Sequence, residues 1–119
     1  MKILIIEDDR LISLMLTKMV QKMGHEVLAV HAQGEMAVNA VDEMPVDLIL
    51  MDIMLEGTMD GIEAMQAIQS KHNSIPVIYI TGNSDESTKS RASATNYAAY
   101  LVKPITYTQL QQIINSLQA

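Results

Sequence analysis

The chain has 119 residues, 49% of them apolar, a net charge of −6 at pH 7 and no cysteine. This length fits one folded domain with a single core, and the lack of cysteine excludes disulfides, thiolate metal sites and cysteine nucleophiles. The acidic balance without a Lys/Arg cluster argues against direct nucleic-acid binding, and no apolar run reaches the roughly 18 residues of a membrane span, so we expect a cytoplasmic protein without membrane contact.

Apolar runs and segments of helical periodicity alternate along the chain. Short apolar runs predict five buried strands, at residues 2–6, 26–30, 47–51, 75–80 and 98–102. Apolar side chains at helical spacing, with capping residues, Gly or Pro near the ends, predict five helices between and after them, at residues 11–23, 34–44, 61–72, 84–94 and 106–118.

Continuous apolar strands between helices are typical of a parallel sheet that is covered on both faces. Right-handed crossovers then place helices on both sides of the sheet. We therefore predict an α/β fold with a doubly wound, five-stranded sheet in the order 2-1-3-4-5. The pattern fills residues 1–119 as one domain, and we expect no output domain in this chain. With no Phe or Trp, the ten methionines are expected to fill core volume.

Charged residues follow three of the predicted strands. Glu7, Asp8 and Asp9 follow the first, Asp52 follows the third, and Lys103 follows the fifth. The carboxyl ends of parallel strands share one edge, and ligands bind there at the switch in strand order, between the first and third strands. Carboxylates are the ligands that Mg²⁺ prefers. The sequence therefore predicts a divalent-cation site suited to phosphoryl chemistry.

Two other acidic residues have a simpler interpretation. Asp9 precedes the first predicted helix and Asp60 precedes the third, where a short acidic side chain caps the free backbone N–H groups. We interpret both as helix caps. The histidines are scattered with no shared spacing, and we interpret them as structural residues: His25, His31 and His72.

Five short motifs occur in order along the chain: ILIIEDD at 3–9, DLILMD at 47–52, DG at 60–61, PVIYITG at 76–82 and YLVKP at 100–104. Each alone is a weak signal. Together they resemble the receiver domain of two-component response regulators, over the whole chain and at nearly the family's spacing. The resemblance implies the flavodoxin-like receiver fold and a signalling role in a phosphorelay.

The resemblance also implies a role for individual residues. Asp52 would be the phosphoacceptor, taking a phosphoryl group from a sensor histidine kinase or a histidine phosphotransfer domain. Mg²⁺, or Mn²⁺ in its place, would be held by Glu7, Asp8, Asp52 and the backbone carbonyl of Met54. Such a domain takes part once in each cycle, so we expect a signalling phosphoacceptor and not an enzyme.

The remaining motif residues would complete the site. Lys103 would pair with Asp52 and then with the phosphoryl oxygens, Thr81 would donate its hydroxyl to the phosphate, and Gly82 would leave room beside it. The bond before Pro104 is cis in this family. Thr81 and Tyr100 would form the switch, which acts on the surface of the fourth helix, fifth strand and fifth helix. An unknown output protein would read that surface, and a homodimer on activation is possible.

The loop after Asp52 departs from the family's usual pattern. Residues 53–59 make it one residue longer, and Glu56 stands where a Pro is typical. Similar loops occur in receivers joined to sensory or kinase modules, which suggests a kinase-associated relay. Met54 and Asn83 occupy positions that tune the lifetime of the phosphoryl group. Because an apolar Met54 side chain cannot orient an attacking water, we expect slow self-dephosphorylation.

Three other function classes remain as alternatives. A phosphatase of the haloacid-dehalogenase type also uses an Asp nucleophile, but it needs a second Asp two residues later, and Glu7-Asp8-Asp9 lacks that arrangement around a first-strand nucleophile. A flavodoxin-like cofactor binder needs a Ser/Thr/Gly phosphate loop where this chain has acids. A receiver-shaped module that takes no phosphate would not need the set Asp8, Asp52, Thr81 and Lys103.

Overall fold

The structure, a computed structural model, describes residues 1–118. Over these residues, five strands form one parallel sheet in the order β2-β1-β3-β4-β5, which confirms the predicted topology. The strands are β1 (Lys2–Ile6), β2 (Glu26–His31), β3 (Leu48–Met51), β4 (Val77–Thr81) and β5 (Tyr97–Val102).

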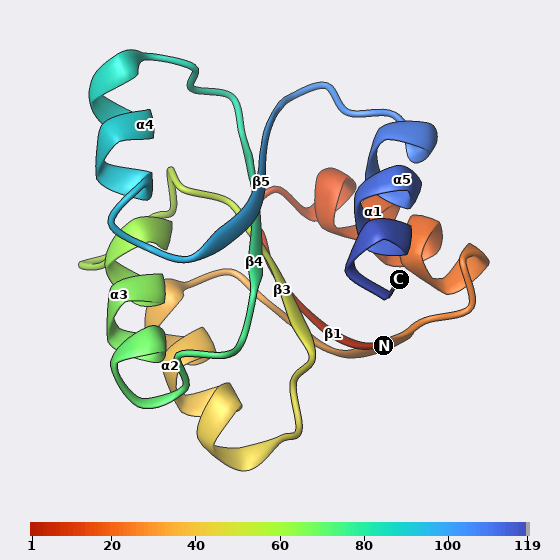
Figure 1. Cartoon of the computed structure of the whole chain (residues 1–119), viewed down its shortest axis with the longest axis horizontal. Helices are drawn as coiled ribbons and strands as arrows, with labels where there is room; N and C mark the ends of the chain where they lie inside the picture. The colour runs from red at the N-terminus through yellow and green to blue at the C-terminus, as the bar shows by residue number, and fades with distance from the viewer. Residues whose placement is uncertain (119) are drawn as a thin grey trace.

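Helices cover the sheet on both sides. In Figure 1, α1 and α5 lie on one side of the sheet, and α2, α3 and α4 lie on the other. This division is what right-handed crossovers between parallel strands require when the chain winds in both directions from β1. The helices are α1 (Arg10–Lys22), α2 (Gly34–Glu43), α3 (Gly61–Lys71), α4 (Glu86–Ala92) and α5 (Tyr107–Gln118).

The core has two layers because successive strand residues point to opposite faces of the sheet. In β1, Leu4 and Ile6 join the cluster with α2 and α3, whereas Ile3 and Ile5 join the cluster with α1 and α5. The central strands β1, β3 and β4 are thus apolar on both faces, and their ends are held firmly in place. The edge strands β2 and β5 are only partly buried, so full cover is confirmed for the central strands alone.

Several boundaries differ from the prediction by one or two residues. β4 begins at Val77 and not at residue 75, because Pro76 has no N–H to give to a ladder. The same strand ends at Thr81, which is therefore its last residue and does not follow it. Helix α4 begins only after Asp85, whose side chain accepts a hydrogen bond from the Thr88 N–H and caps the helix.

The expectation for the methionines is confirmed for most of them, since Met1, Met19, Met23, Met44 and Met59 are partly buried and pack against the core. Met51 and Met65 are fully buried, but Met15, Met36 and Met54 are 39%, 43% and 62% exposed. Branched aliphatic side chains fill most of the core, since nearly all residues of the central strands are Ile, Leu or Val. The exposed methionines are available for contacts at the surface.

Candidate functional site

Three acidic side chains meet at the carboxyl end of the central strands. Glu7 and Asp8 follow β1, Asp52 follows β3, and one carboxylate oxygen of each lies within 4.8 Å of the others. The two strands are adjacent, with Ile6 opposite Met51, so their next residues are neighbours. Glu7 and Asp52 are only 3% and 5% exposed. The predicted gathering of these acids is confirmed.

Lys103 reaches this cluster from the far end of β5. Its Nζ lies 3.2 Å from Asp52 Oδ2, and 3.1 Å from each carboxylate oxygen of Glu7. The pairing with Asp52 was expected, but the double contact with Glu7 was not. The bond between Lys103 and Pro104 is cis, as the resemblance implied.

Burial and crowding change the acidity of the cluster. Burial, followed by the nearby charge of Asp52, raises the pKa of Glu7 to about 7, although Lys103 opposes this shift. Burial lowers the pKa of Lys103, but its hydrogen bonds and charge interactions with Glu7 and Asp52 outweigh burial and raise it. One ammonium group therefore serves two carboxylates, and a proton or a further cation is needed to balance the site.

A second group of polar residues closes the other side of the crevice. Thr81 is fully buried at the end of β4, and its Oγ1 accepts a hydrogen bond of 3.2 Å from the Asn83 N–H. The Tyr100 hydroxyl donates a 2.6 Å hydrogen bond to the Asn83 carbonyl. The Tyr100 hydroxyl is therefore bound within the domain.

The crevice itself is bordered by Asp52 and Lys103 from the first group and by Asn83 from the second. It has a volume of about 570 Å³ and is lined by Asp52, Met54, Gly82, Asn83, Ser84, Asp85 and Lys103. A Cβ atom at Gly82 would meet no neighbouring atom within 4 Å, so there is open space beside it. The Met54 N–H donates to Asp52 Oδ1 over 3.3 Å, while the Met54 side chain points outward and is exposed.

The remaining acids stand where the cap interpretation put them. Asp9 Oδ1 accepts hydrogen bonds from the N–H groups of Leu11 and Ile12 at the start of α1. Asp60 forms a reciprocal capping box with Glu63 at the start of α3. Neither residue joins the cluster of Glu7, Asp8 and Asp52, so both predictions are confirmed.

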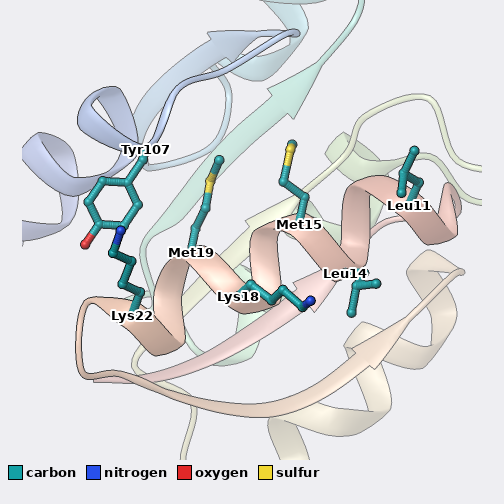
Figure 2. A pocket seen from close by; sticks show the side chains of 7 residues that line it. All are labelled: Leu11, Leu14, Met15, Lys18, Met19, Lys22 and Tyr107. Carbon is teal, nitrogen blue, oxygen red and sulfur yellow. The ribbon is translucent and has the colours of Figure 1, made fainter.

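An apolar groove runs along α1 and reaches the start of α5. Figure 2 shows its lining residues, Leu11, Leu14, Met15, Lys18, Met19 and Lys22 from α1 and Tyr107 from α5. Leu11 and Leu14 are 77% and 52% exposed, which is unusual for adjacent leucines on one helix. A smaller hollow, lined in part by Met15, Lys103 and Pro104, lies between this groove and the acidic cluster. Sequence periodicity did not identify the groove, because helical spacing predicts a helix but not which of its apolar side chains stay exposed.

The sequence matches the family model described as response regulator receiver domain over residues 3–115. The chain belongs to this family. The match covers nearly the whole chain and includes every residue of the acidic cluster, of the Thr81–Tyr100 group and Lys103. The strand order and the cluster of acids agree with this assignment of the chain to the receiver domains of two-component systems.

Two relatives place receiver domains of this kind in different contexts. The chain is 33% identical over 118 residues to the sensor protein GacS of Pseudomonas syringae pv. syringae, covering 95% of this chain and 13% of GacS. It is 32% identical over 120 residues to the protein PilH of Pseudomonas aeruginosa, covering 99% of this chain and 98% of PilH. The chain therefore spans a small part of one relative and nearly all of the other.

A solved structure links the family to a metal. The receiver domain of the sensor histidine kinase PA1611 from Pseudomonas aeruginosa is 28% identical, with a TM-score of 0.86, covering 97% of this chain and 94% of that one. That receiver domain holds a magnesium ion coordinated in its active-site cleft. In the present chain, the oxygens of Glu7, Asp8 and Asp52 form a cluster that could bind a metal ion.

Within residues 1–118, none of the helices has the length and apolar character needed to cross a membrane.

Proposed function

We propose that this receiver domain accepts a phosphoryl group on Asp52 from the phosphohistidine of a histidine kinase or a histidine phosphotransfer domain. The observation that carries the proposal is the Asp52 carboxylate, buried among two other acids and in contact with Lys103. A carboxylate oxygen of Asp52 forms the new P–O bond, the P–N bond breaks, and its electron pair returns to the imidazole.

The acidic cluster fits a hard divalent cation. Its side-chain donors are all carboxylate oxygens, which suit Mg²⁺ or Mn²⁺. Glu7, Asp8, Asp52 and the backbone carbonyl of Met54 would hold the ion. When bound, it would neutralise charge on the phosphoryl oxygens during transfer. The proximity of three carboxylates, with the single ammonium group of Lys103 shared between Glu7 and Asp52, supports this assignment.

The other motif residues receive and report the phosphoryl group. Lys103 Nζ can leave Asp52 for a phosphoryl oxygen, and the Thr81 hydroxyl can donate to another. Thr81 and Tyr100 are joined through Asn83, which accepts from the Tyr100 hydroxyl and donates to Thr81. A shift of Thr81 toward the phosphate would therefore disturb the anchor of Tyr100. The surface of α4, β5 and α5 would change with it, as a shift between two pre-existing states that an output protein reads.

The groove on α1 is where the donor would dock. A phosphohistidine must reach Asp52, and the hollow lined by Met15, Lys103 and Pro104 shares Met15 with the groove and Lys103 with that site. Lys18 and Lys22 border the apolar floor in a chain of net charge −6, which favours docking of a partner helix with an apolar face and an acidic flank.

Leu14→Glu is expected to reduce transfer from phosphorylated histidine kinases while leaving uptake from acetyl phosphate unchanged. Met36→Glu, at a similarly exposed apolar site on α2, serves as the control.

Intact mass after incubation with acetyl phosphate tests the central claim. The wild-type chain should gain one phosphoryl group in the presence of Mg²⁺ but not without it, and Asp52→Asn should gain none. A wild-type chain that binds Mg²⁺ but gains no mass from acetyl phosphate or any phosphorylated histidine kinase would contradict the proposal. It would favour a module that works without phosphate.

The same assay reports the lifetime of the phosphoryl group. Met54 projects an exposed apolar side chain beside the crevice, and this group cannot orient water for attack on the phosphorus atom. We therefore propose slow self-dephosphorylation, as a relay that holds phosphate for a downstream transfer would need. After removal of the donor, a lifetime of only a few seconds would contradict this part of the proposal.

A further inference from the structure

Gly61, the first residue of α3, is packed directly against the backbone of the phosphoacceptor. A Cβ atom placed on Gly61 would overlap the carbonyl oxygen of Asp52. It would also lie 2.9 Å from Ile53 Cα and 2.9 Å from Met51 Cγ, closer than such atoms approach in proteins. The contact depends on the missing side chain, because any other residue would put atoms where the Asp52 peptide now lies.

Backbone hydrogen bonds hold the two sides of this contact together. The Gly61 N–H donates to the Ile53 carbonyl over 2.9 Å, and the Asp52 N–H donates to the Ile6 carbonyl over 2.9 Å. The Asp52 peptide is therefore held between the end of β1 on one side and the start of α3 on the other. Its carboxylate is directed into the crevice from a backbone that has contacts on both sides.

Helix α3 cannot easily retreat from this position. Ile62 and Met65 are fully buried in the core, and the capping box of Asp60 and Glu63 ties down the first turn. Protein interiors are close-packed. A Cβ atom added to a helix that cannot shift therefore displaces the neighbouring backbone. The backbone of residues 52–54 lies outside β3 and leads into a loop, so an added Cβ atom displaces this backbone more readily than the buried first turn of α3.

We propose that Gly61 is a positioning residue for the phosphoacceptor, setting where the Asp52 carboxylate and the following backbone stand relative to Glu7, Asp8 and Lys103. This inference rests on the proposed function of Asp52. Mg²⁺ demands nearly octahedral oxygen geometry, so a displaced Asp52 lowers its affinity. Misplacing a reacting group by about 1 Å can cost about 10²-fold in rate, so phosphoryl uptake falls further than folding stability would indicate.

The test compares Gly61→Ala with Gly34→Ala. Gly34 is also a buried first residue of a helix, and its added Cβ would lie 3.1 Å from Ala64 Cβ and 3.2 Å from the Met59 carbonyl oxygen, without touching Asp52. For both variants and the wild type we would measure thermal unfolding, Mg²⁺ affinity, the ¹⁵N–¹H resonances of Asp52 and Ile53, and the rate of phosphoryl uptake. The measurements of Mg²⁺ affinity and of phosphoryl uptake are repeated in trimethylamine N-oxide, which favours the folded state.

The expected result separates the two variants. Gly61→Ala should fold, shift the Asp52 and Ile53 resonances, weaken Mg²⁺ binding about tenfold and slow phosphoryl uptake by about 10–10²-fold. Gly34→Ala should lose stability without these changes. The inference is overturned if Gly61→Ala keeps wild-type Mg²⁺ affinity and resonances, or if it is unfolded under every condition, which would make Gly61 a folding residue only. If the wild-type chain binds Mg²⁺ but takes no phosphoryl group, the proposed function fails while the Mg²⁺ comparison still decides the role of Gly61.

Discussion

Two groups of residues differ in where the fold places them. The acid side consists of Glu7, Asp8 and Asp52, which follow two central strands. The response side consists of Thr81, Asn83 and Tyr100, which belong to β4, its following loop and the edge strand β5. The acid side is held by strands buried on both faces and by the backbone contact with Gly61. On the response side, Thr81 is buried at the end of β4, whereas Asn83 lies in the following loop and Tyr100 is anchored to it by a hydrogen bond, next to a seven-residue helix.

This difference assigns cation binding and phosphoryl transfer to the closely packed acid side and the conformational switch to the response side. Cation binding and phosphoryl transfer depend on ligand positions, so they benefit from a closely packed framework. A switch needs an element whose two arrangements differ little in free energy, which a partly exposed edge strand and a short helix can provide. Changes on the acid side should therefore alter chemistry, and changes on the response side should alter the state of α4 and β5.

The largest effect is expected from Lys103→Met. It removes the only ammonium group in contact with Glu7 and Asp52 among the described residues, and with it a charge that would stabilise the phosphoryl oxygens. Removing one such donor typically costs about 10²–10³-fold in rate. Phosphoryl uptake from acetyl phosphate, followed by intact mass, should fall by that factor. Lys71→Met, at the exposed end of α3, should leave the rate unchanged, and an equal loss in both variants would contradict the role given to Lys103.

The next effect concerns Mg²⁺ and pH. Burial and then the charge of Asp52 raise the pKa of Glu7 to about 7, and a carboxylate must lose its proton to bind a cation. Mg²⁺ affinity should therefore be roughly tenfold weaker at pH 6 than at pH 8, as measured by isothermal titration. Glu7→Gln should bind more weakly but lose most of this pH dependence. A wild-type affinity that stays constant over the same range would contradict the assignment.

The same shift determines a pH dependence of stability without metal. Because the pKa of Glu7 is raised from the model-peptide value of 4.5, the folded chain holds a proton that the unfolded chain releases between these pH values. The stabilising contribution of Glu7 is fully present below about pH 4.5 and is lost as the pH rises through about 7. In EDTA, urea unfolding should detect this loss in the wild type and a smaller one in Glu7→Gln.

Tyr100→Phe tests the response side. It removes the hydroxyl that donates to the Asn83 carbonyl and should lower the unfolding free energy by about 1 kcal/mol. Mg²⁺ affinity should stay within about twofold of wild type, because Tyr100 does not touch the acid side. Amide exchange in α4 should become faster. A clear loss of Mg²⁺ affinity would mean that the two sides of the crevice are not separable in the way described.

The smallest effect is expected from Arg91→Gln. The Arg91 guanidinium pairs with Asp60 over 2.8 Å and links α4 to the start of α3, but both side chains are partly exposed. Exposed pairs typically contribute about 0–1 kcal/mol, so the midpoint of urea unfolding should barely move. Asp60→Ala should cost more, about 1 kcal/mol beyond the lost pair, because it also removes the cap of α3. An equal effect of the two changes would contradict this division.

Much of the fold and of the site could be predicted because both follow from local patterns. The apolar runs and caps located every strand and helix to within a few residues, and the ends of β1, β3 and β5 brought Glu7, Asp52 and Lys103 together as expected. The misplaced details arose where long-range packing decides. The leucines of α1 have helical spacing whether they face the core or water, so the pattern did not predict the exposure of Leu11 and Leu14.

The sequence by itself determined the order of the elements, the parallel sheet and the chemical groups at its edge, because periodicity, capping and strand ends are properties of short segments. Only the tertiary structure decided that Lys103 contacts Glu7 as closely as Asp52, that Tyr100 is anchored on Asn83, and that Gly61 meets the Asp52 backbone. These contacts join residues far apart in the chain or depend on packing to within an ångström. Their distances are therefore set by the sum of all packing in the domain and by no local pattern.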